Sequence, residues 1–266
     1  MKVVKNYHTH TFRCGHASGD VDDYCVAAKE HELQVLGMSD HTALPDNRWP
    51  RVRMDFSELD DYLGAIDRAR EEHPELVILK GVESEFAPEY REYLRDELLG
   101  ERELDYMVGG THYFPCGDEW LGAYGGTDTI RGLRGYTDHL IDSMRTGLFA
   151  FMAHPDLFGN AYMQWDENTT SASHDICAAA AECGVPLEIN GYGLRKRKVR
   201  TRDGERAMYP WLPFWEIAAE HQVSVVVNSD AHRPQDVAAG LQDAASIATQ
   251  FNLEFADLSH LEPDPP

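Results

Sequence analysis

The sequence is poor in cysteine, in long apolar runs and in positive charge. Its five cysteines are odd in number and form no CxxC pair, so we expect reduced thiols and a cytoplasmic protein, not a disulfide framework. No apolar run approaches the roughly 18 residues of a membrane-spanning helix, and MKVVKNYHTH turns polar too early for a secretory signal. With 24 Lys and Arg against 46 Asp and Glu, the net charge is -22. This charge disfavours broad binding to nucleic acid or anionic membranes, although a local basic patch could still bind a phosphate.

Internal repeats, low-complexity tracts and Pro/Ser-rich linkers are also missing. We therefore expect residues 1–266 to form a single α/β domain, since 42% hydrophobic residues can bury a substantial core. Short β-branched runs alternate with amphipathic ones, which predicts a parallel sheet, either open or closed as a barrel of seven units. The expected strands are Val3–His8, Gln34–Asp40, Leu76–Glu83, Leu104–His112, Leu148–His154, Val185–Asn190 and Val223–Asp230. The expected helices are Val21–Leu33, Phe56–His73, Glu89–Leu99, Thr129–Gly147, His174–Cys183, Leu212–His221 and Gln235–Gln250.

Each of the seven expected strands ends at a polar residue of metal-ligand or acid type. In chain order these are His8 with His10, Asp40 with His41, Glu83, His112, His154, Glu188 with Asn190, and Asp230 with His232. In a barrel of alternating strands and helices, the carboxyl ends of the strands gather on one face, where active sites are built. A purely structural role would give no preference for histidine at this end of the strands. The pattern therefore predicts one polar pocket.

The segment HTHTFRCGH begins the candidate site. His8 and His10 are two apart, so in an extended segment they point to the same side and can bind one metal ion. His16 follows on a loop, where it could serve a neighbouring ion, and Cys14 lies among these histidines. Imidazole suits zinc, manganese and iron. An HxH pair alone is equally consistent with buried structural histidines, but the six downstream partners favour a metal site.

Carboxylates complete the pattern. His41 is a candidate ligand, and its neighbour Asp40 is expected to orient a ligand by hydrogen bonding. Glu83 follows an apolar strand, and because an uncompensated buried carboxylate is costly, we expect it to bridge two metal ions. Glu85 would share its face in an extended chain and is the alternative. Asp230 and His232 are again two residues apart.

Two or three cations held close together would supply a nucleophile. They would lower the pKa of a shared water from 15.7 to about 7 and neutralise phosphoryl oxygens, so we expect a metal-bridging hydroxide. A basic run in this acidic chain points to phosphate as well. Its members are Arg195, Lys196, Arg197, Lys198, Arg200, Arg202 and Arg206. Arg195 is nearest the sixth strand and is our candidate for a phosphate fork. The remainder could be a solvated loop, steer anions or contact a partner subunit.

Seven motifs resemble, in order, those of the polymerase-and-histidinol-phosphatase (PHP) superfamily, and most closely its stand-alone histidinol-phosphatase branch. They are HTHTFRCGH, SDH, GVESEF, GGTHYF, HPDL, LEINGYGLRK and NSDAH, over about residues 6 to 233. The resemblance implies a distorted (β/α)7 TIM-like barrel. It also implies two or three divalent cations, Zn, Mn or Fe, and a small phosphorylated substrate.

The resemblance implies a set of ligands for each ion. One ion would be held by His8, His10, Glu83 and Asp230. A second would be held by Glu83, His112 and His154, and a third by His16, His41 and His232. LEINGYGLRK resembles the branch's phosphate-binding segment, which supports Arg195. Gly191-Tyr192 and the long basic run before Tyr209-Pro210 depart from the family pattern near the substrate end of the pocket.

We therefore expect hydrolysis of a phosphate monoester, with L-histidinol phosphate as the favoured substrate. Glu83, Asp230 and Arg195 are the expected catalytic residues, and Arg195, His41 and His232 are expected to contact the phosphate. A metal-bound water, Asp20 or Asp156 could protonate the leaving group. Other small phosphomonoesters or nucleotides are alternative substrates. A nuclease, a metal-dependent amidohydrolase and a non-catalytic metal-binding regulatory module are rival classes, and the acidic charge and the lack of a strand-end lysine argue against the first two.

Overall fold

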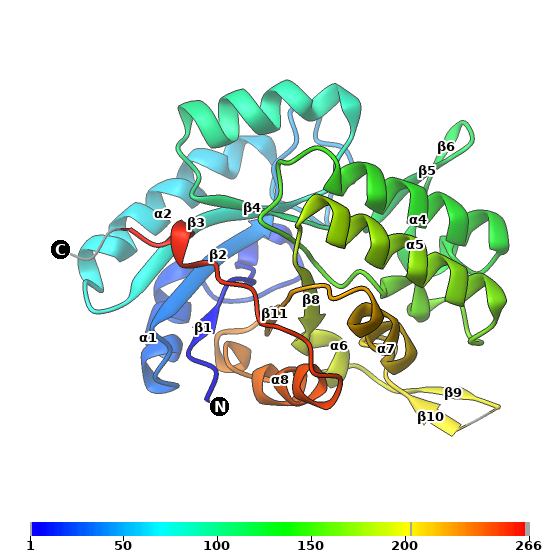
Figure 1. Ribbon diagram of the computed structural model, residues 1–266. Coiled ribbons are helices and arrows are strands. Elements are labelled where there is room, and N and C mark those ends of the chain that lie inside the picture. The colour runs from blue at the N-terminus through cyan, green and yellow to red at the C-terminus, as the bar shows by residue number, and fades with distance from the viewer. Residues whose placement is uncertain (1, 203, 264–266) are drawn as a thin grey trace. The chain divides into compact units, whose positions relative to one another are not determined.

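The computed structural model describes residues 2–202 and 204–263 (Figure 1). These residues form two compact units. The first unit holds the described residues of 1–108, 228–242 and 257–266, and the second holds residues 109–227 and 243–256. The first unit is therefore assembled from three separate stretches of the chain. Our expectation of a single domain stays a prediction.

Four strands of the main sheet belong to the first unit. They are β1 (Lys5–Asn6), β2 (Val35–His41), β3 (Val77–Ser84) and β4 (Tyr106–Gly109), adjacent in that order, with only Gly109 assigned to the second unit. β1 pairs with β2 and β2 with β3 in parallel, and the last register pair joins His41 to Glu83. Every residue of β2 is buried, as its continuous apolar run predicts. Parallel pairing brings the polar carboxyl ends of these strands to one edge.

Two glycines of these strands make room for a tyrosine. A Cβ on Gly37 would lie 2.2 Å from the Tyr106 hydroxyl, and one on Gly81 would lie 2.5 Å from its ring. The Tyr106 hydroxyl donates a hydrogen bond of 2.7 Å to the backbone carbonyl of Tyr7. The glycines thus let Tyr106 cross beneath the strands and hold the backbone next to His8.

Helices connect these strands. α1 (Val21–Glu30) begins with a capping box in which Asp20 and Asp23 satisfy the first backbone N–H groups. α2 (Leu59–Glu72) follows the short helix η2 (Phe56–Glu58). The further short helices of this unit are η1 (Phe12–Cys14), η3 (Pro88–Tyr90), η6 (Pro234–Asp236) and η7 (Ser259–Leu261). The segment η4 (Tyr93–Glu101) is a π-helix, where we expected an α-helix over Glu89–Leu99.

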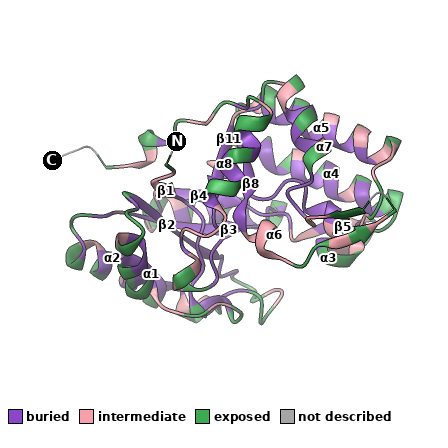
Figure 2. Ribbon diagram, turned by 90° about the horizontal axis from the view of Figure 1, so that it is seen from below, coloured by how far each residue is buried: buried purple, intermediate pink, exposed green. Residues whose placement is uncertain are grey.

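The second unit contributes β7 (Phe151–Met152), β8 (Leu187–Asn190) and β11 (Val225–Asn228), adjacent in that order, with Asn228 at the boundary. β7 and β8 pair in parallel. The longer helices are α4 (Ile130–Met144), α5 (Glu167–Cys183), α7 (Leu212–Glu220) and α8 (Leu241–Gln250). The strands are buried, whereas each long helix alternates buried and exposed residues (Figure 2). This is the pattern of helices that cover a sheet.

All seven expected strands are present, but most are shorter than predicted. α5 begins seven residues before the expected His174, and α8 begins after Gly240 instead of at Gln235. Several small elements of the second unit were not predicted. They are the hairpin β5 (Tyr113–Cys116) with β6 (Glu119–Gly122), the helices α3 (Ala123–Gly126), η5 (Leu157–Asn160) and α6 (Gly191–Arg195), and the hairpin β9 (Val199–Thr201) with β10 (Gly204–Arg206).

Two expectations from composition can be compared with the structure. Within the described residues no helix combines the length and the apolar character needed to cross a membrane. All five cysteines are free thiols, as the missing disulfide pattern predicted.

Candidate metal centre

His8 and His10 lie side by side just after β1, and both are fully buried. Their ring centroids are 5.0 Å apart. Thr9 between them forms a parallel bridge with Ala231, and the backbone N–H of His10 donates to the Ala231 carbonyl at 2.9 Å. The extended conformation predicted from the HxH spacing is therefore present, and it is held in place by the segment that carries Asp230 and His232.

Two buried carboxylates face these imidazoles. The His8 Nε2 atom lies 3.3 Å from Glu83 Oε2 and 3.7 Å from Asp230 Oδ1. The His10 Nε2 atom lies 3.6 Å and 3.0 Å from the same two oxygens. Glu83 sits near the end of β3, while Asp230 follows β11 with a left-handed φ of 48°. The four side chains predicted to share one ion thus converge on one point.

Charge in this cluster is strongly coupled. Burial by itself lowers the pKa of His10, but hydrogen bonds to Asp230 and Asp40 raise it to about 9. Burial raises the pKa of the Asp230 carboxyl, yet His8, His10 and His232 together hold it well below its usual range. Asp230 is therefore a carboxylate at neutral pH, the form that a cation needs.

Three further histidines surround this centre. The Nε2 atoms of His16 and His232 are 3.1 Å apart, and His41 Nδ1 lies 3.2 Å from Glu83 Oε2. The His10 ring has centroid distances of 4.4 Å to His41 and 4.3 Å to His232. Burial, followed by the charge on His10, lowers the pKa of His232 to about 3, so its imidazole is neutral near pH 7. The three histidines predicted to hold a third ion are brought together.

Two buried groups stand behind these histidines. Cys14 has donor atoms of His16 and His232 within 4.8 Å of its sulfur, and burial raises the pKa of its thiol. One oxygen of Asp40 lies 3.5 Å from His10 Nδ1, and the other accepts hydrogen bonds from the Thr11 N–H and hydroxyl at 3.0 and 2.5 Å. Asp40 therefore lies where the sequence placed it, behind a candidate ligand.

The structure separates Glu83 from its alternative, Glu85. Glu85 Oε2 accepts a hydrogen bond of 2.7 Å from Arg53, and both side chains are almost fully buried. The Arg53 guanidinium also donates to the Thr42 carbonyl at 3.1 Å. Glu85 thus belongs to a buried ion pair, and Glu83 is the carboxylate that faces the histidines.

In the second unit, His112 and His154 form an edge-to-face pair with ring centroids 4.9 Å apart. The backbone N–H of His154 donates to Glu188 Oε2 at 3.1 Å, and the Asn190 side chain donates to the same oxygen at 2.7 Å. His154 has a positive φ of 32°, which is uncommon outside glycine. Glu188 and Asn190 therefore fix the backbone that presents His154.

The basic run divides into members with different surroundings. Arg195 ends α6, is half-buried, and lies with its Cζ atom 5.3 Å from the centre of the Tyr192 ring. The ammonium of Lys196 lies 4.6, 4.7 and 5.1 Å from the ring centres of Tyr192, Tyr124 and Tyr209. Both cations are thus held against aromatic faces, a stable arrangement for Lys and Arg.

Arg206 instead has a structural role. Its guanidinium stacks on Trp211 at 3.7 Å and donates to four backbone carbonyls. These belong to Ala207, Met208, Gly159 and Tyr162, at 2.8 to 3.1 Å. A role in steering anions is therefore not supported for Arg206, because its guanidinium is bound by these carbonyls and by the Trp211 ring.

The two candidate proton donors, Asp20 and Asp156, lie in different surroundings. Asp20 caps α1 and forms an ion pair with Arg13 at 2.5 Å. Although partial burial raises the pKa of the Asp20 carboxyl, Arg13 and the Val21 N–H lower it, which makes Asp20 a poor proton donor. Asp156 is fully buried and accepts hydrogen bonds from the Trp211 N–H at 2.5 Å and the Trp215 indole at 3.1 Å.

Comparison with known families places these residues in context. Residues 6–191 match the PHP domain, well over half of the chain. The chain belongs to the PHP family. A relative from Deinococcus radiodurans named probable histidinol-phosphatase is 30% identical to this PHP protein over 254 residues, which cover 92% of each sequence. A relative of the same name from Schizosaccharomyces pombe is 24% identical and covers 99% of the chain and 91% of its own length.

This PHP protein is similar in fold to a solved structure. That structure is of a histidinol phosphate phosphatase from Lactococcus lactis in complex with zinc, L-histidinol and phosphate. The two chains are 17% identical, with a TM-score of 0.73 over 98% of each. The fold is therefore the distorted (β/α)7 TIM-like barrel that the seven alternating strands and the family resemblance predicted. The His, Asp and Glu groups described above are of the kind that holds divalent metal ions.

Proposed function

We propose that this PHP protein is a metal-dependent phosphomonoesterase that hydrolyses L-histidinol phosphate to L-histidinol and phosphate. The observation that carries the proposal is the convergence of His8, His10, Glu83 and Asp230 on one buried point. Two relatives named probable histidinol-phosphatase and a fold shared with a histidinol phosphate phosphatase favour this substrate.

The donor atoms fit a divalent cation. Ligands about 2.1 Å from a tetrahedral ion lie about 3.4 Å from one another. The nitrogen–oxygen distances between the two imidazoles and the two carboxylates range from 3.0 to 3.7 Å. Two carboxylates buried this deeply are costly without a cation to balance them. The residues present therefore suit the group that the family implies.

We assign one ion to His8, His10, Glu83 and Asp230, and another to His16, His41 and His232, with Glu83 able to serve more than one ion. His112 and His154, paired in the second unit, are the remaining proposed ligands. The nitrogen and carboxylate donors suit zinc, manganese or iron. Bound cations would lower the pKa of a water molecule and neutralise phosphoryl oxygens.

The protein's own groups prepare this chemistry. Hydrogen bonds from Thr11 hold the Asp40 carboxylate 3.5 Å from His10 Nδ1, and the Thr9–Ala231 bridge aligns the segments that carry His8, His10, Asp230 and His232. We propose Glu83 and Asp230 as catalytic residues, because their carboxylates supply the negative charge of the centre. Arg195 would hold the phosphoryl oxygens, helped by His41 and His232 where their ring nitrogens remain accessible. Tyr192 limits the motion of the Arg195 guanidinium and so prepares it to bind.

Phosphate release by the purified protein tests the proposal. It would be measured with manganese, zinc or iron, on histidinol phosphate, AMP, other small monoesters and a short single-stranded oligonucleotide. We expect kcat/KM for histidinol phosphate to exceed the others at least a hundredfold, and His10→Ala to abolish activity.

Each other outcome has a definite meaning. Even activity over all monoesters would keep the metal chemistry and overturn the named substrate. Cleavage of the oligonucleotide alone would indicate a nuclease. No turnover with any metal, by protein shown to bind that metal, would favour a non-catalytic metal-binding module.

A further inference from the structure

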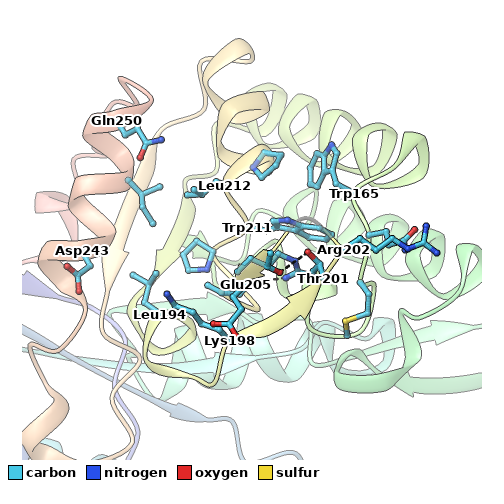
Figure 3. A pocket seen from close by; sticks show the side chains of 18 of the residues that line it. Trp165, Leu194, Lys198, Thr201, Arg202, Glu205, Trp211, Leu212, Asp243 and Gln250 are labelled. Carbon is cyan, nitrogen blue, oxygen red and sulfur yellow. Dashed lines mark hydrogen bonds between the residues drawn. The ribbon is translucent and has the colours of Figure 1, made fainter.

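A cavity of about 850 Å³ lies in the second unit, and none of the proposed metal or phosphate ligands lines it. Its walls come from the hairpin β9–β10, the start of α7, the loop before α5 and one face of α8 (Figure 3). This volume falls within the range of pockets that enclose a small organic ligand. The cavity is therefore a candidate binding site in its own right.

One wall is aromatic and partly exposed. Trp165 and Trp211 meet edge to face, with ring centroids 5.0 Å apart. Met163 and Leu212, which also line the cavity, are 43% and 44% exposed. Large apolar side chains grouped around a concavity mark a surface that binds something apolar. Flat aromatic rings on this wall favour a flat aromatic ligand.

The opposite wall is polar. Asp243, Ser246 and Gln250 lie three and seven residues apart on α8, so they share one face of the helix, together with Ile247. Figure 3 shows Asp243 and Gln250 on α8, across the cavity from the hairpin. Carboxylate and amide groups on this wall can bind hydroxyl or amino groups of a ligand.

The hairpin adds positive charge. Lys198 and Arg202 line the cavity and are exposed, and within residues 2–202 and 204–263 neither forms an ion pair with a carboxylate. Arg200, by contrast, is paired with Glu205 at 3.2 Å, and Arg206 is engaged by backbone carbonyls. In a chain of net charge -22, two cations at the mouth of an aromatic cavity favour an anionic ligand.

We propose that this cavity binds a nucleoside monophosphate. The base would lie against the ring of Trp165, and the phosphate would be bound by Lys198 and Arg202. The sugar hydroxyls or the polar edge of the base would face Asp243 and Gln250. An uncharged aromatic molecule would leave the cations unused, and a bare phosphate would leave the aromatic wall unused. This ligand uses all three walls.

Binding of AMP, adenosine and inorganic phosphate to the whole protein tests the proposal. Titrations would follow tryptophan fluorescence and calorimetric heat, in the unaltered protein and in His10→Ala, which removes a central residue of the proposed metal site. We expect saturable AMP binding that survives His10→Ala, with adenosine at least fivefold weaker and phosphate weaker still.

Cavity variants locate the site. Lys198→Ala combined with Arg202→Ala should weaken AMP binding at least tenfold and change adenosine binding less than twofold. Trp165→Leu should weaken both at least fivefold, whereas Arg145→Ala, an exposed arginine beyond the cavity, should change neither. Circular dichroism would confirm that each variant is folded. Loss of AMP binding in His10→Ala, or equal AMP affinity in the double variant and the unaltered protein, would overturn the proposal.

Discussion

At the scale of single residues, the two neighbouring glutamates Glu83 and Glu85 show what a sequence can and cannot determine. Glu83 lies near the end of β3, Glu85 directly follows that strand, and both are buried. The type of residue needed at this strand end could be predicted. Which of the two faces the histidines could not, because the choice depends on Arg53, which is 32 residues away from Glu85 in the chain and binds it.

These glutamates give a matched pair of substitutions. Glu83→Gln should lower kcat/KM at least a thousandfold and reduce the bound metal, because it removes a charged donor from the centre. Glu85→Gln should keep the metal but reduce the free energy of unfolding by about 3 kcal/mol, since it leaves Arg53 buried without its partner charge. Metal analysis and urea unfolding would be measured on both. The reverse assignment of the two effects would refute our choice of Glu83.

Arg206 and Arg200, which lie in one hairpin, give a second matched pair of substitutions. Arg206→Ala should lower the free energy of unfolding by about 2 kcal/mol or more, because four carbonyls lose a charged donor and Trp211 loses its stacking partner. Arg200→Ala removes an exposed ion pair and should change stability by less than about 1 kcal/mol. Equal effects in urea unfolding would show that the contacts of Arg206 contribute little.

At the scale of helices and strands, prediction succeeded where a continuous apolar run ended at a polar residue, as in β2, β3 and β8. It failed for the hairpin β9–β10, whose strands contain no buried residue and have no apolar alternation. The Asp203-Gly204 pair in the sequence is a hairpin signal that could have indicated this turn. α5 starts early because Asp166 and Thr169 form a capping box, although the first turns of the helix are polar.

The cap of α5 gives a prediction that depends on pH. Partial burial raises the pKa of Asp166, but hydrogen bonds from Thr169, Tyr162 and Asn168 lower it below its usual range. A lowered folded-state pKa means that the carboxylate stabilises the fold fully above the ordinary value of about 3.9, and less as pH falls through the folded-state pKa.

Asp166→Ala should therefore reduce the free energy of unfolding by about 1 kcal/mol at pH 7, and by progressively less below pH 4. Asp166→Asn retains a capping oxygen without a titrating carboxyl, and should cost less than the alanine at pH 7. Urea unfolding from pH 7 to pH 3 would measure both. A difference that grew as the pH fell would contradict the assigned direction.

At the scale of the whole molecule, the seven-unit barrel followed from the order of the strands and motifs, whereas the set of metal ligands stays a prediction. The distances within the centre did not, because they depend on contacts such as the bridge between Thr9 and Ala231. The aromatic cavity of the second unit could not be predicted either, since its walls come from four separate segments.

Metal binding should stabilise the whole fold. A ligand present at about a thousand times its Kd adds about 4 kcal/mol, which corresponds to a shift in Tm on the order of 10 °C for a chain of this size. Chelation should therefore lower Tm by roughly this amount in the unaltered protein and change it little in His10→Ala. Scanning calorimetry with and without EDTA would measure this, and equal shifts in both proteins would place the stabilising metal elsewhere.

The bridge between Thr9 and Ala231 also has a consequence for synthesis on the ribosome. Asp230 and His232 are added more than 200 residues after His8 and His10. Contacts this distant in sequence form slowly, because a long loop must close first. The nascent chain therefore carries these two imidazoles without Asp230 while the intervening residues are added. The centre can assemble only after residues 228–242, the second stretch of the first unit, have been added, so metal loading is expected to follow their synthesis.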